Sequence, residues 1–353
     1  MAHVTLADLG GWTPILNRLT SSSDLDAVQA QAAMAEILEG DATSAQIAGF
    51  IVALRMKGET VEELTGLVAA MVDKATYVPL PGIEGVIDIV GTGGDRSSSI
   101  NVSTLAALVI AGAGGRVCKH GNRAASSACG AADLLEALGV AIDLGPAGVA
   151  RCVQEAGIGF CFAPRFHAAM RHAVPTRREL GVPTVFNILG PLANPARVRR
   201  QVTGVADPSM AERMAQVLRA NGTERALVVH GHDGLDELTT TTTSTVHELR
   251  DGEIRIYVVD PRPLGLAPAT LDDLRGGDAP TNAEMARSVL DAEAGARRDV
   301  VILNAAAGLV AGGRAEDLPA GLDIAREAID SGAAALALHR LVAASQAAKA
   351  DES

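Results

Sequence analysis

Residues 86–95 read VIDIVGTGGD, an apolar run that ends in a glycine-rich turn. Short apolar runs bounded by glycine are typical of buried strands, and a helical pattern begins near Asn101. Similar segments follow along the chain: we expect strands at 116–118, 201–205 and 226–229, and helices at 106–113, 128–138 and 208–220. This alternation predicts an α/β domain built on a mainly parallel sheet.

The first 75 residues carry helical periodicity and no strand signal. Thr60 and Glu63 form a capping box, and Pro79 and Pro81 end the helical pattern. A second helical pattern runs over 165–180, and we expect residues 165–190 to pack back onto the first unit. Two β-like runs, 244–249 and 254–259, precede alanine-rich helices. The sequence therefore predicts two domains: a small all-helical domain (1–75 plus 165–190) and a large α/β domain (80–164 plus 191–353) with a mainly parallel central sheet flanked by helices.

Composition excludes several classes of protein. The formal net charge of -12 argues against non-specific nucleic-acid binding, which needs a surplus of lysine and arginine. The four cysteines contain no CxxC pair, which indicates reduced, mostly buried thiols: Cys118, Cys129, Cys152 and Cys161. No apolar run reaches the ~20 residues that span a bilayer, and we expect a cytoplasmic protein without a membrane partner.

The glycine-rich turn, Gly91 to Asp95, lies between a strand and a helix, where backbone N–H groups and a helix N-terminus can bind phosphate. The alternative is a tight connection in which Asn101 or Ser103 caps the helix. A later glycine cluster, 112–115, ends a helix instead of opening one. It is therefore a helix stop rather than a dinucleotide fingerprint, which argues against a nicotinamide cofactor.

The segment from Lys119 to Ser127 reads KHGNRAASS and precedes another helical pattern. Lys119 and Arg123 can form charge-assisted hydrogen bonds, and Ser126 and Ser127 add neutral donors. This composition favours a ligand that carries several negative charges. A solvated basic loop is the alternative.

Asp236 and Glu237 follow the strand expected at 226–229, on a loop. Magnesium is typically held by one or two carboxylates together with water and phosphate oxygens, and Ser103 can add a hydroxyl oxygen. Solvated surface charges are the alternative. The threonine tract 239–243 is expected to form a strand with hydrogen bonds to this loop. The histidine pairs at 230 and 232 and at 167 and 172 have no third ligand at a recognised spacing, so no zinc site is predicted.

In combination and in this order, these motifs resemble those of the anthranilate phosphoribosyltransferase family of tryptophan biosynthesis. The resemblance rests on GTGGD at 91–95, NVST at 101–104, KHGNR at 119–123, VFNILGPLANP at 185–195 and DGLDELTTTTTS at 233–244. It covers essentially the whole chain. The sequence departs from the family pattern at Ser99, where threonine is common, and at Ala131, where serine is common.

The resemblance implies a nucleoside phosphorylase/phosphoribosyltransferase-like fold and a magnesium-dependent homodimer. The enzyme would transfer the phosphoribosyl group of 5-phosphoribosyl 1-pyrophosphate to the amine of anthranilate. The implied phosphoribosyl pyrophosphate ligands are Gly91, Gly94, Asp95, Ser99, Asn101, Val102, Ser103, Thr104, Lys119, His120, Gly121, Asn122, Arg123, Ala124, Ala125, Ser126 and Ser127. The implied anthranilate ligands are Gly91, Asn122 and Arg177, and the magnesium ligands are Ser103, Asp236 and Glu237. Lys119 and Arg177 are the residues expected to contribute most to catalysis.

Two other functions stay open at this point. A pyrimidine nucleoside phosphorylase-like enzyme would share the architecture but would have little use for the acidic metal pair. A non-catalytic homologue that binds nucleic acid would show salt-sensitive binding to single strands without turnover.

Overall fold

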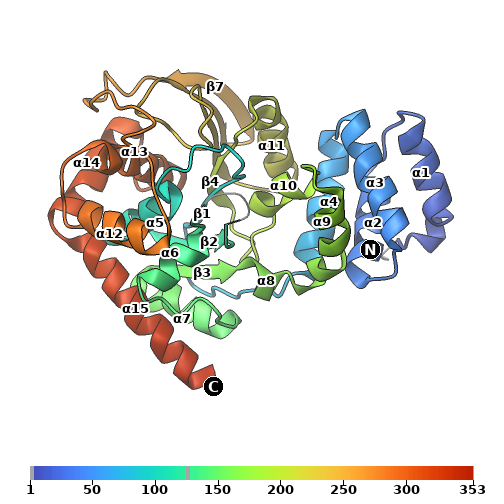
Figure 1. Ribbon diagram of the computed structural model, residues 1–353, viewed down its shortest axis with the longest axis horizontal. Helices are drawn as coiled ribbons and strands as arrows, with labels where there is room; N and C mark the ends of the chain where they lie inside the picture. Colours follow the sequence, from blue (N-terminus) through green and yellow to red (C-terminus); the bar gives the residue numbers. More distant parts are fainter. Residues whose placement is uncertain (1–3, 125–127, 353) are drawn as a thin grey trace.

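The computed structural model describes residues 4–124 and 128–352 (Figure 1). Within them, seven strands form one mixed sheet in the order β3-β2-β1-β4-β5-β6-β7. The strands are β1 (Val86–Gly91), β2 (Arg116–Gly121), β3 (Ile158–Phe162), β4 (Arg200–Gly204), β5 (Arg225–Gly231), β6 (Ser244–Arg250) and β7 (Glu253–Val259). Strands β1 to β5 run parallel, and β6 and β7 are added antiparallel. The predicted mainly parallel sheet is confirmed.

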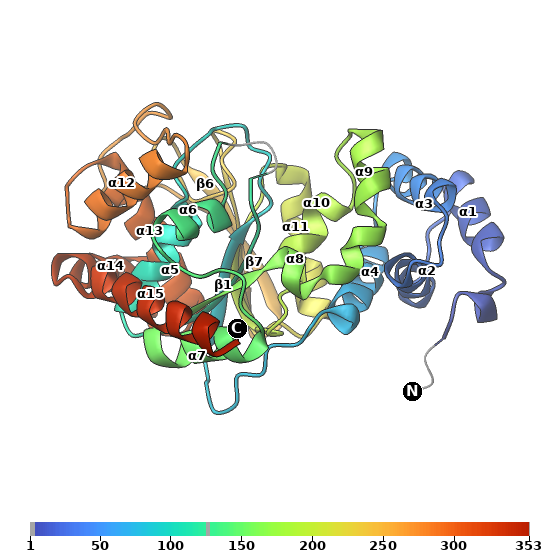
Figure 2. The same ribbon diagram turned by 60° about the horizontal axis from the view of Figure 1, so that its bottom comes forward.

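Helices cover both faces of this sheet (Figures 1 and 2). The helices α5 and α13 pack against β1, and α11 packs against β5 and β6. The helices of the α/β part are α5 (Val102–Gly112), α6 (Ala131–Ala137), α7 (Pro146–Ala156), α11 (Pro208–Ala220), α12 (Ala279–Leu290), α13 (Ala296–Ala311), α14 (Leu318–Asp330) and α15 (Ala333–Glu352). No helix among the described residues is both long enough and apolar enough to cross a membrane.

The N-terminal helices form a bundle at the right of Figure 1. They are η1 (Ala7–Leu9), α1 (Trp12–Thr20), α2 (Ala27–Glu39), α3 (Ser44–Lys57) and α4 (Val61–Lys74). The predicted capping box of Thr60 and Glu63 begins α4. Within the bundle, α2 and α4 approach closely, since a Cβ atom at Gly66 would lie 2.1 Å from the backbone oxygen of Ala27.

Residues 163–192 form a series of short helices, so the continuous helical pattern expected over 165–180 is wrong. The segments are α8 (Ala163–Phe166), η2 (Ala168–His172), α9 (Val174–Leu180), α10 (Phe186–Leu189) and η3 (Gly190–Leu192). Pro175 lies in the first turn of α9, where its missing N–H is tolerated but cannot continue a preceding helix. Helix α9 packs against α3 (Figure 2). Arg55 of α3 donates a hydrogen bond to the Pro183 oxygen at 2.5 Å.

Three other expectations need correction. Strand β2 extends to Gly121, so Lys119 and His120 lie in the sheet rather than in a loop. Helix α6 begins at Ala131, three residues later than expected, and Gly130 is its N-cap. The threonine tract 239–243 forms no strand. The sequence patterns also missed β3 and α7.

Candidate functional site

The loop after β5 packs onto glycines at the carboxyl ends of the parallel strands. Gly91 ends β1, Gly204 ends β4, and the two residues are paired in the sheet. A Cβ atom at Gly204 would lie 1.5 Å from the backbone oxygen of Asp236, and one at Gly91 would lie 2.2 Å from the Asp236 Oδ2 atom. Glycine at these two positions therefore lets the acidic loop reach this edge of the sheet.

Asp236 and Glu237, the acid pair, lie buried at this edge. The Asp236 Oδ2 atom accepts a hydrogen bond from the Gly93 amide at 2.7 Å, and the Glu237 Oε1 atom accepts one from the Ser103 amide at 3.2 Å. Burial, assisted by repulsion from Asp95, raises the pKa of Asp236 to about 6. Burial and repulsion from Asp236 raise the pKa of Glu237 well above its ordinary value. A cation bound between the two carboxylates would relieve both effects.

Lys119 supplies a buried positive charge from β2. Its Nζ atom donates hydrogen bonds to the Ile89 backbone oxygen and to Ser103 Oγ, the latter at 3.2 Å. Burial lowers the pKa of Lys119, whereas Asp88 and the acid pair oppose that change. Lys119, Ser103 and the acid pair therefore lie together, although they are far apart in the sequence.

The glycine-rich turn and the start of α5 border the acid pair. Gly93 and Gly94 have φ values of 67° and 83°, and a Cβ atom on either would have no neighbour within 4 Å. The turn therefore faces open space, as a phosphate-binding turn would require. Inside α5, the Thr104 hydroxyl is buried without a hydrogen-bond partner among the described residues, and the Val102 side chain is packed in the core.

Two predicted ligands have side chains or backbones engaged in local structure. The Asn101 Nδ2 atom donates a hydrogen bond to the Cys129 oxygen at 3.0 Å, and the Asn101 Oδ1 atom accepts one from Asn282 Nδ2 at 3.0 Å. Ser99 forms an isolated β-bridge with Arg275. These contacts link the start of α5 to the segment that leads into α12.

His120 points to a different group of residues from Lys119, as neighbours in a strand do. Its Nδ1 atom lies 3.1 Å from the Gly190 oxygen, and its backbone amide donates to Asp88 Oδ1 at 3.1 Å. Burial lowers the pKa of His120 to about 3, so the ring is neutral. Asp88 also accepts a 2.7 Å hydrogen bond from Asn194. Sequence analysis assigned no role to Asp88 or Asn194, although both lie within quoted stretches, at 86–95 and 185–195.

Arg123 is paired with acids of α6 in the described conformation. Its guanidinium lies 2.8 Å from Asp133 and 2.5 Å from Glu136. Asp133 also accepts hydrogen bonds from the amides of Ala124 and Gly130, at 3.0 and 2.9 Å. Asp133, which sequence analysis missed, thus contacts Arg123, Ala124 and Gly130. The predicted ligands Ala125, Ser126 and Ser127 lie outside the described residues.

Arg177 lies on α9, on the helical side of the molecule. Its guanidinium stacks on the Phe186 ring at 5.0 Å, and burial lowers its pKa. No carboxylate among the described residues lies within ion-pair distance of Arg177. Its neighbour Arg178 is exposed. Arg177 is therefore the better placed of the two arginines to bind an anion. Another predicted anthranilate ligand, Asn122, accepts a hydrogen bond from the Arg123 backbone amide.

The threonine tract supports the acidic loop through its hydroxyls. Thr239 Oγ1 and Thr241 Oγ1 both donate to Asp233 Oδ2, at 2.6 and 2.5 Å. The Thr239 amide donates to Ser244 Oγ at 3.0 Å. The expected hydrogen bonds to the acidic loop are therefore present without the expected strand.

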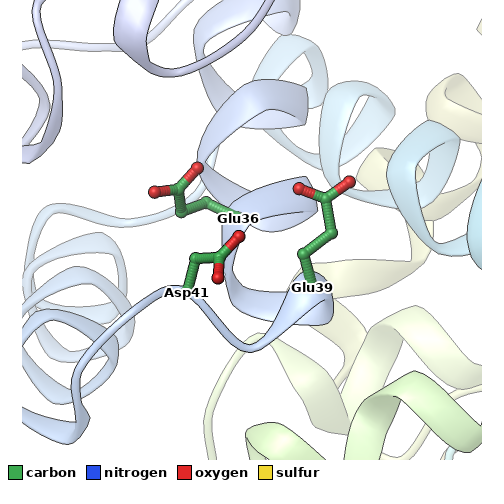
Figure 3. A group of neighbouring side chains, drawn as sticks. All are labelled: Glu36, Glu39 and Asp41. Atoms are coloured by element: carbon green, nitrogen blue, oxygen red, sulfur yellow. The ribbon is translucent and has the colours of Figure 1, made fainter.

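A separate group of three acids, Glu36, Glu39 and Asp41, lies at the end of α2 (Figure 3). Glu39 is paired with Lys74 at 2.5 Å, and both Glu39 and Asp41 are exposed. These acids belong to the helical bundle, and no glycine turn or helix start borders them as at the acid pair. We assign them no metal.

Two family models match the chain. The model described as "Glycosyl transferase family, a/b domain" matches residues 84–335, and that described as "Glycosyl transferase family, helical bundle domain" matches residues 13–75. Among curated proteins, the chain is 56% identical to the anthranilate phosphoribosyltransferase of Rhodococcus jostii over 93% of this chain and 92% of that protein. It is 54% identical to the enzyme of the same name from Streptomyces griseus over 95% of this chain and 96% of that protein.

Solved structures give the same result. The anthranilate phosphoribosyltransferase of Thermus thermophilus aligns with a TM-score of 0.89 and 43% identity, covering 94% of this chain and 99% of that one. The enzyme from Saccharomyces cerevisiae, in complex with PRPP and Mg, aligns with a TM-score of 0.87 and 28% identity, covering 95% and 98%. The similarity thus extends over both the helical and the α/β parts.

Proposed function

The chain belongs to the anthranilate phosphoribosyltransferase family, and on that basis we propose that the carboxyl edge of its sheet binds phosphoribosyl pyrophosphate beside the acid pair. The chain transfers the phosphoribosyl group to the amine of anthranilate, giving N-(5-phosphoribosyl)anthranilate and pyrophosphate, in tryptophan biosynthesis. One observation carries the site proposal: the Gly93 amide, Ser103 and Lys119 converge on the acid pair.

The proposed metal is Mg²⁺, with Ser103, Asp236 and Glu237 as its protein ligands. Their oxygens are the donors that Mg²⁺ prefers, and two adjacent buried carboxylates form a site where a bound cation would be favoured. The Saccharomyces cerevisiae relative, solved with PRPP and Mg, supports this assignment. When bound, the ion neutralises charge on the diphosphate as it leaves.

The diphosphate and ribose phosphate would bind to amide groups and cations around the acid pair. We propose the open turn at Gly91, Gly94 and Asp95, the segment from Ser99 to Thr104, and the segment from Lys119 to Ser127 as this surface. Arg123 would have to exchange its contacts with Asp133 and Glu136 for phosphate oxygens, whereas Lys119 is already in place. Charge-assisted hydrogen bonds of this kind contribute about 1.5–3 kcal/mol each.

Anthranilate would bind between the two parts of the molecule, through Gly91, Asn122 and Arg177. Arg177 has a rigid, planar guanidinium held on Phe186, and we propose that it pairs with the anthranilate carboxylate. The amine would then face C1 of the ribose. This geometry requires the small unit (1–75 plus 165–190) and the large unit (80–164 plus 191–353) to face each other across the site, and we propose those bounds for the two domains.

In the reaction, the amine nitrogen of anthranilate forms a bond to ribose C1 while the bond from C1 to the diphosphate oxygen breaks. The electron pair of that bond leaves with pyrophosphate, and the amine loses one proton to solvent. Lys119 stabilises the negative charge that grows on the leaving group, so its effect is largest in the transition state. Arg177 contributes to placement of the amine. Placement of both reactants together can be worth ~7–11 kcal/mol in well-oriented reactions, of which Arg177 supplies a part.

A direct test follows the loss of anthranilate fluorescence when phosphoribosyl pyrophosphate is added, with Mg²⁺ and with a chelator. We expect turnover with Mg²⁺ and its loss with chelator. Turnover that persists unchanged in chelator would contradict the metal assignment. We also propose a homodimer from the family resemblance, which light scattering at several protein concentrations tests.

Neither alternative function gains support. The relatives named above are anthranilate phosphoribosyltransferases rather than nucleoside phosphorylases or nucleic-acid-binding proteins. A phosphorylase would also leave the buried acid pair without a metal ion, with Lys119 as the nearby positive charge.

A further inference from the structure

Helix α13 carries an isolated amide in the middle of the large domain. The side chains from Val300 to Ala311 are buried, and Asn304 is the polar one among them, with no exposed surface. Burying a carboxamide costs about 1–3 kcal/mol unless its hydrogen bonds are satisfied, and a leucine would suit an apolar helix equally well. The amide therefore needs an explanation outside α13.

The hydrogen bonds of Asn304 converge on one backbone position. Its Nδ2 atom donates to the Leu238 oxygen at 2.8 Å, and its Oδ1 atom accepts from the Leu238 amide at 3.0 Å. The second Nδ2 hydrogen is donated to the Val300 oxygen at 2.9 Å within α13. Both donors of the amide and its oxygen are thus in use. Asn304 pairs with Leu238 as a neighbouring strand would, although Leu238 lies outside the strands.

Leu238 directly follows the acid pair, which makes this contact relevant to the site. On one side, the Asp236 backbone rests on Gly204, where a Cβ atom would lie only 1.5 Å from its oxygen. On the other side, Asn304 binds both the N–H and the C=O of Leu238, the residue directly after Glu237. The two carboxylates are therefore held between two fixed points of the backbone.

We propose that Asn304 is a positioning residue for the metal and diphosphate site, acting through the Leu238 backbone on the direction of the acid pair. This role rests on the proposed function of Asp236 and Glu237. Asn304 itself touches neither carboxylate in the described contacts. Groups that orient metal ligands from outside commonly change metal affinity or activity by 10–100-fold when they are removed.

The test compares Asn304→Leu, which removes the amide at similar volume, with Asn304→Asp, which keeps the shape and an acceptor but cannot supply both N–H donors. Electron paramagnetic resonance measures the binding of Mn²⁺ to the whole protein in the presence of saturating phosphoribosyl pyrophosphate. We expect about 10-fold weaker Mn²⁺ binding in both variants. The KM for anthranilate should change much less than the activation constant for Mg²⁺.

Ser345→Ala is the matched control. Ser345 is also fully buried on a helix and accepts a hydrogen bond from a loop amide, that of Ala141, at 3.1 Å. Ser345 lies on α15, outside the site described above. Removing its hydroxyl should therefore lower the melting temperature without weakening Mn²⁺ binding. If Asn304→Leu does not fold, Asn304→Asp with the same control decides the question.

Two results would overturn the role of Asn304, and they are distinguishable. If Asp236→Asn weakens Mn²⁺ binding but a folded Asn304 variant binds Mn²⁺ as the unchanged protein does, the positioning role alone is wrong. If Asp236→Asn also leaves Mn²⁺ binding unchanged, the proposed metal site itself is wrong, and the role of Asn304 is rejected with it.

Discussion

Asp88 and Asn194 form a buried hydrogen bond of 2.7 Å at the base of the site. Asn194 also donates to the Cys118 oxygen at 2.8 Å, and Asp88 accepts from the His120 amide at 3.1 Å. Cys118 and His120 are the two neighbours of Lys119 on β2, so these contacts fix the strand on either side of Lys119. The Asp88 carboxylate also attracts the Lys119 ammonium, so it contributes to the charge balance of the whole cluster.

The titration of Asp88 should appear in the pH dependence of stability. Burial raises its pKa from 3.8 to about 6, so the folded state binds this proton more tightly than the unfolded chain. The resulting stabilisation is complete below about pH 4 and is lost as the pH rises through 6. Asp88→Asn lacks this titration. The free energy of unfolding of the variant, minus that of the unchanged protein, should therefore rise by up to about 3 kcal/mol as the pH rises from about 4 to above 6.

Urea unfolding at pH 4.5 and pH 7.5 measures this difference. Asp291→Asn serves as a control, since Asp291 is exposed at the end of α12. If the difference in unfolding free energy between Asp88→Asn and the unchanged protein is the same at both pH values, the pKa of Asp88 is not raised in the folded state.

Gly204→Ala should displace the acid pair. The added Cβ atom would overlap the Asp236 backbone, which can move only by shifting the whole loop. We expect a loss of about 1–3 kcal/mol of stability, as for other overpacked positions, together with a large fall in kcat/KM. Thermal melting and the fluorescence assay measure the two effects.

Gly49→Ala is the matched control for this change. Gly49 lies in α3, and its added Cβ atom would meet Leu16 at an ordinary 3.6 Å. Alanine favours helix by roughly 0.5–1 kcal/mol over glycine, so this variant should be at least as stable and fully active. Equal activity of Gly204→Ala and Gly49→Ala would refute the close packing at the strand ends.

Arg177→Ala should raise the KM for anthranilate by roughly 10- to 100-fold, because a charged hydrogen-bonding partner worth about 1.5–3 kcal/mol is lost. The KM for phosphoribosyl pyrophosphate should stay close to its original value. Arg178→Ala, at the exposed neighbouring position, should leave both constants unchanged. Steady-state kinetics with each substrate varied in turn distinguish the two arginines, and equal effects of Arg177→Ala on both substrates would argue against carboxylate binding.

The parts of the candidate site that the sequence singled out are those with a local signal. The glycine-rich turn, the acid pair and Ser103 were singled out by composition next to a strand or a helix, and their convergence follows from the parallel sheet. Lys119 and His120 were expected in a loop because polar residues rarely continue a buried strand. Here the acid pair and the Gly190 oxygen provide the partners that make their burial tolerable.

Other features had no local signal at all. Asn304 lies in an alanine-rich helix, and its function depends on a loop 66 residues away. Asp88 interrupts an apolar strand without a motif, and its partner Asn194 is 106 residues distant. The break between η2 and α9 was signalled by Pro175, but helical periodicity on both sides hid it. Long-range hydrogen bonds of this kind depend on the fold, so local pattern cannot reveal them.

An anomalous difference map from crystals grown with Mn²⁺ and phosphoribosyl pyrophosphate would show directly whether the acid pair holds the metal. We expect a Mn²⁺ peak within bonding distance of Ser103 Oγ, Asp236 and Glu237, with diphosphate oxygens completing its coordination. A peak at Glu36, Glu39 and Asp41 with none at the acid pair, or diphosphate bound away from Lys119, would contradict this expectation.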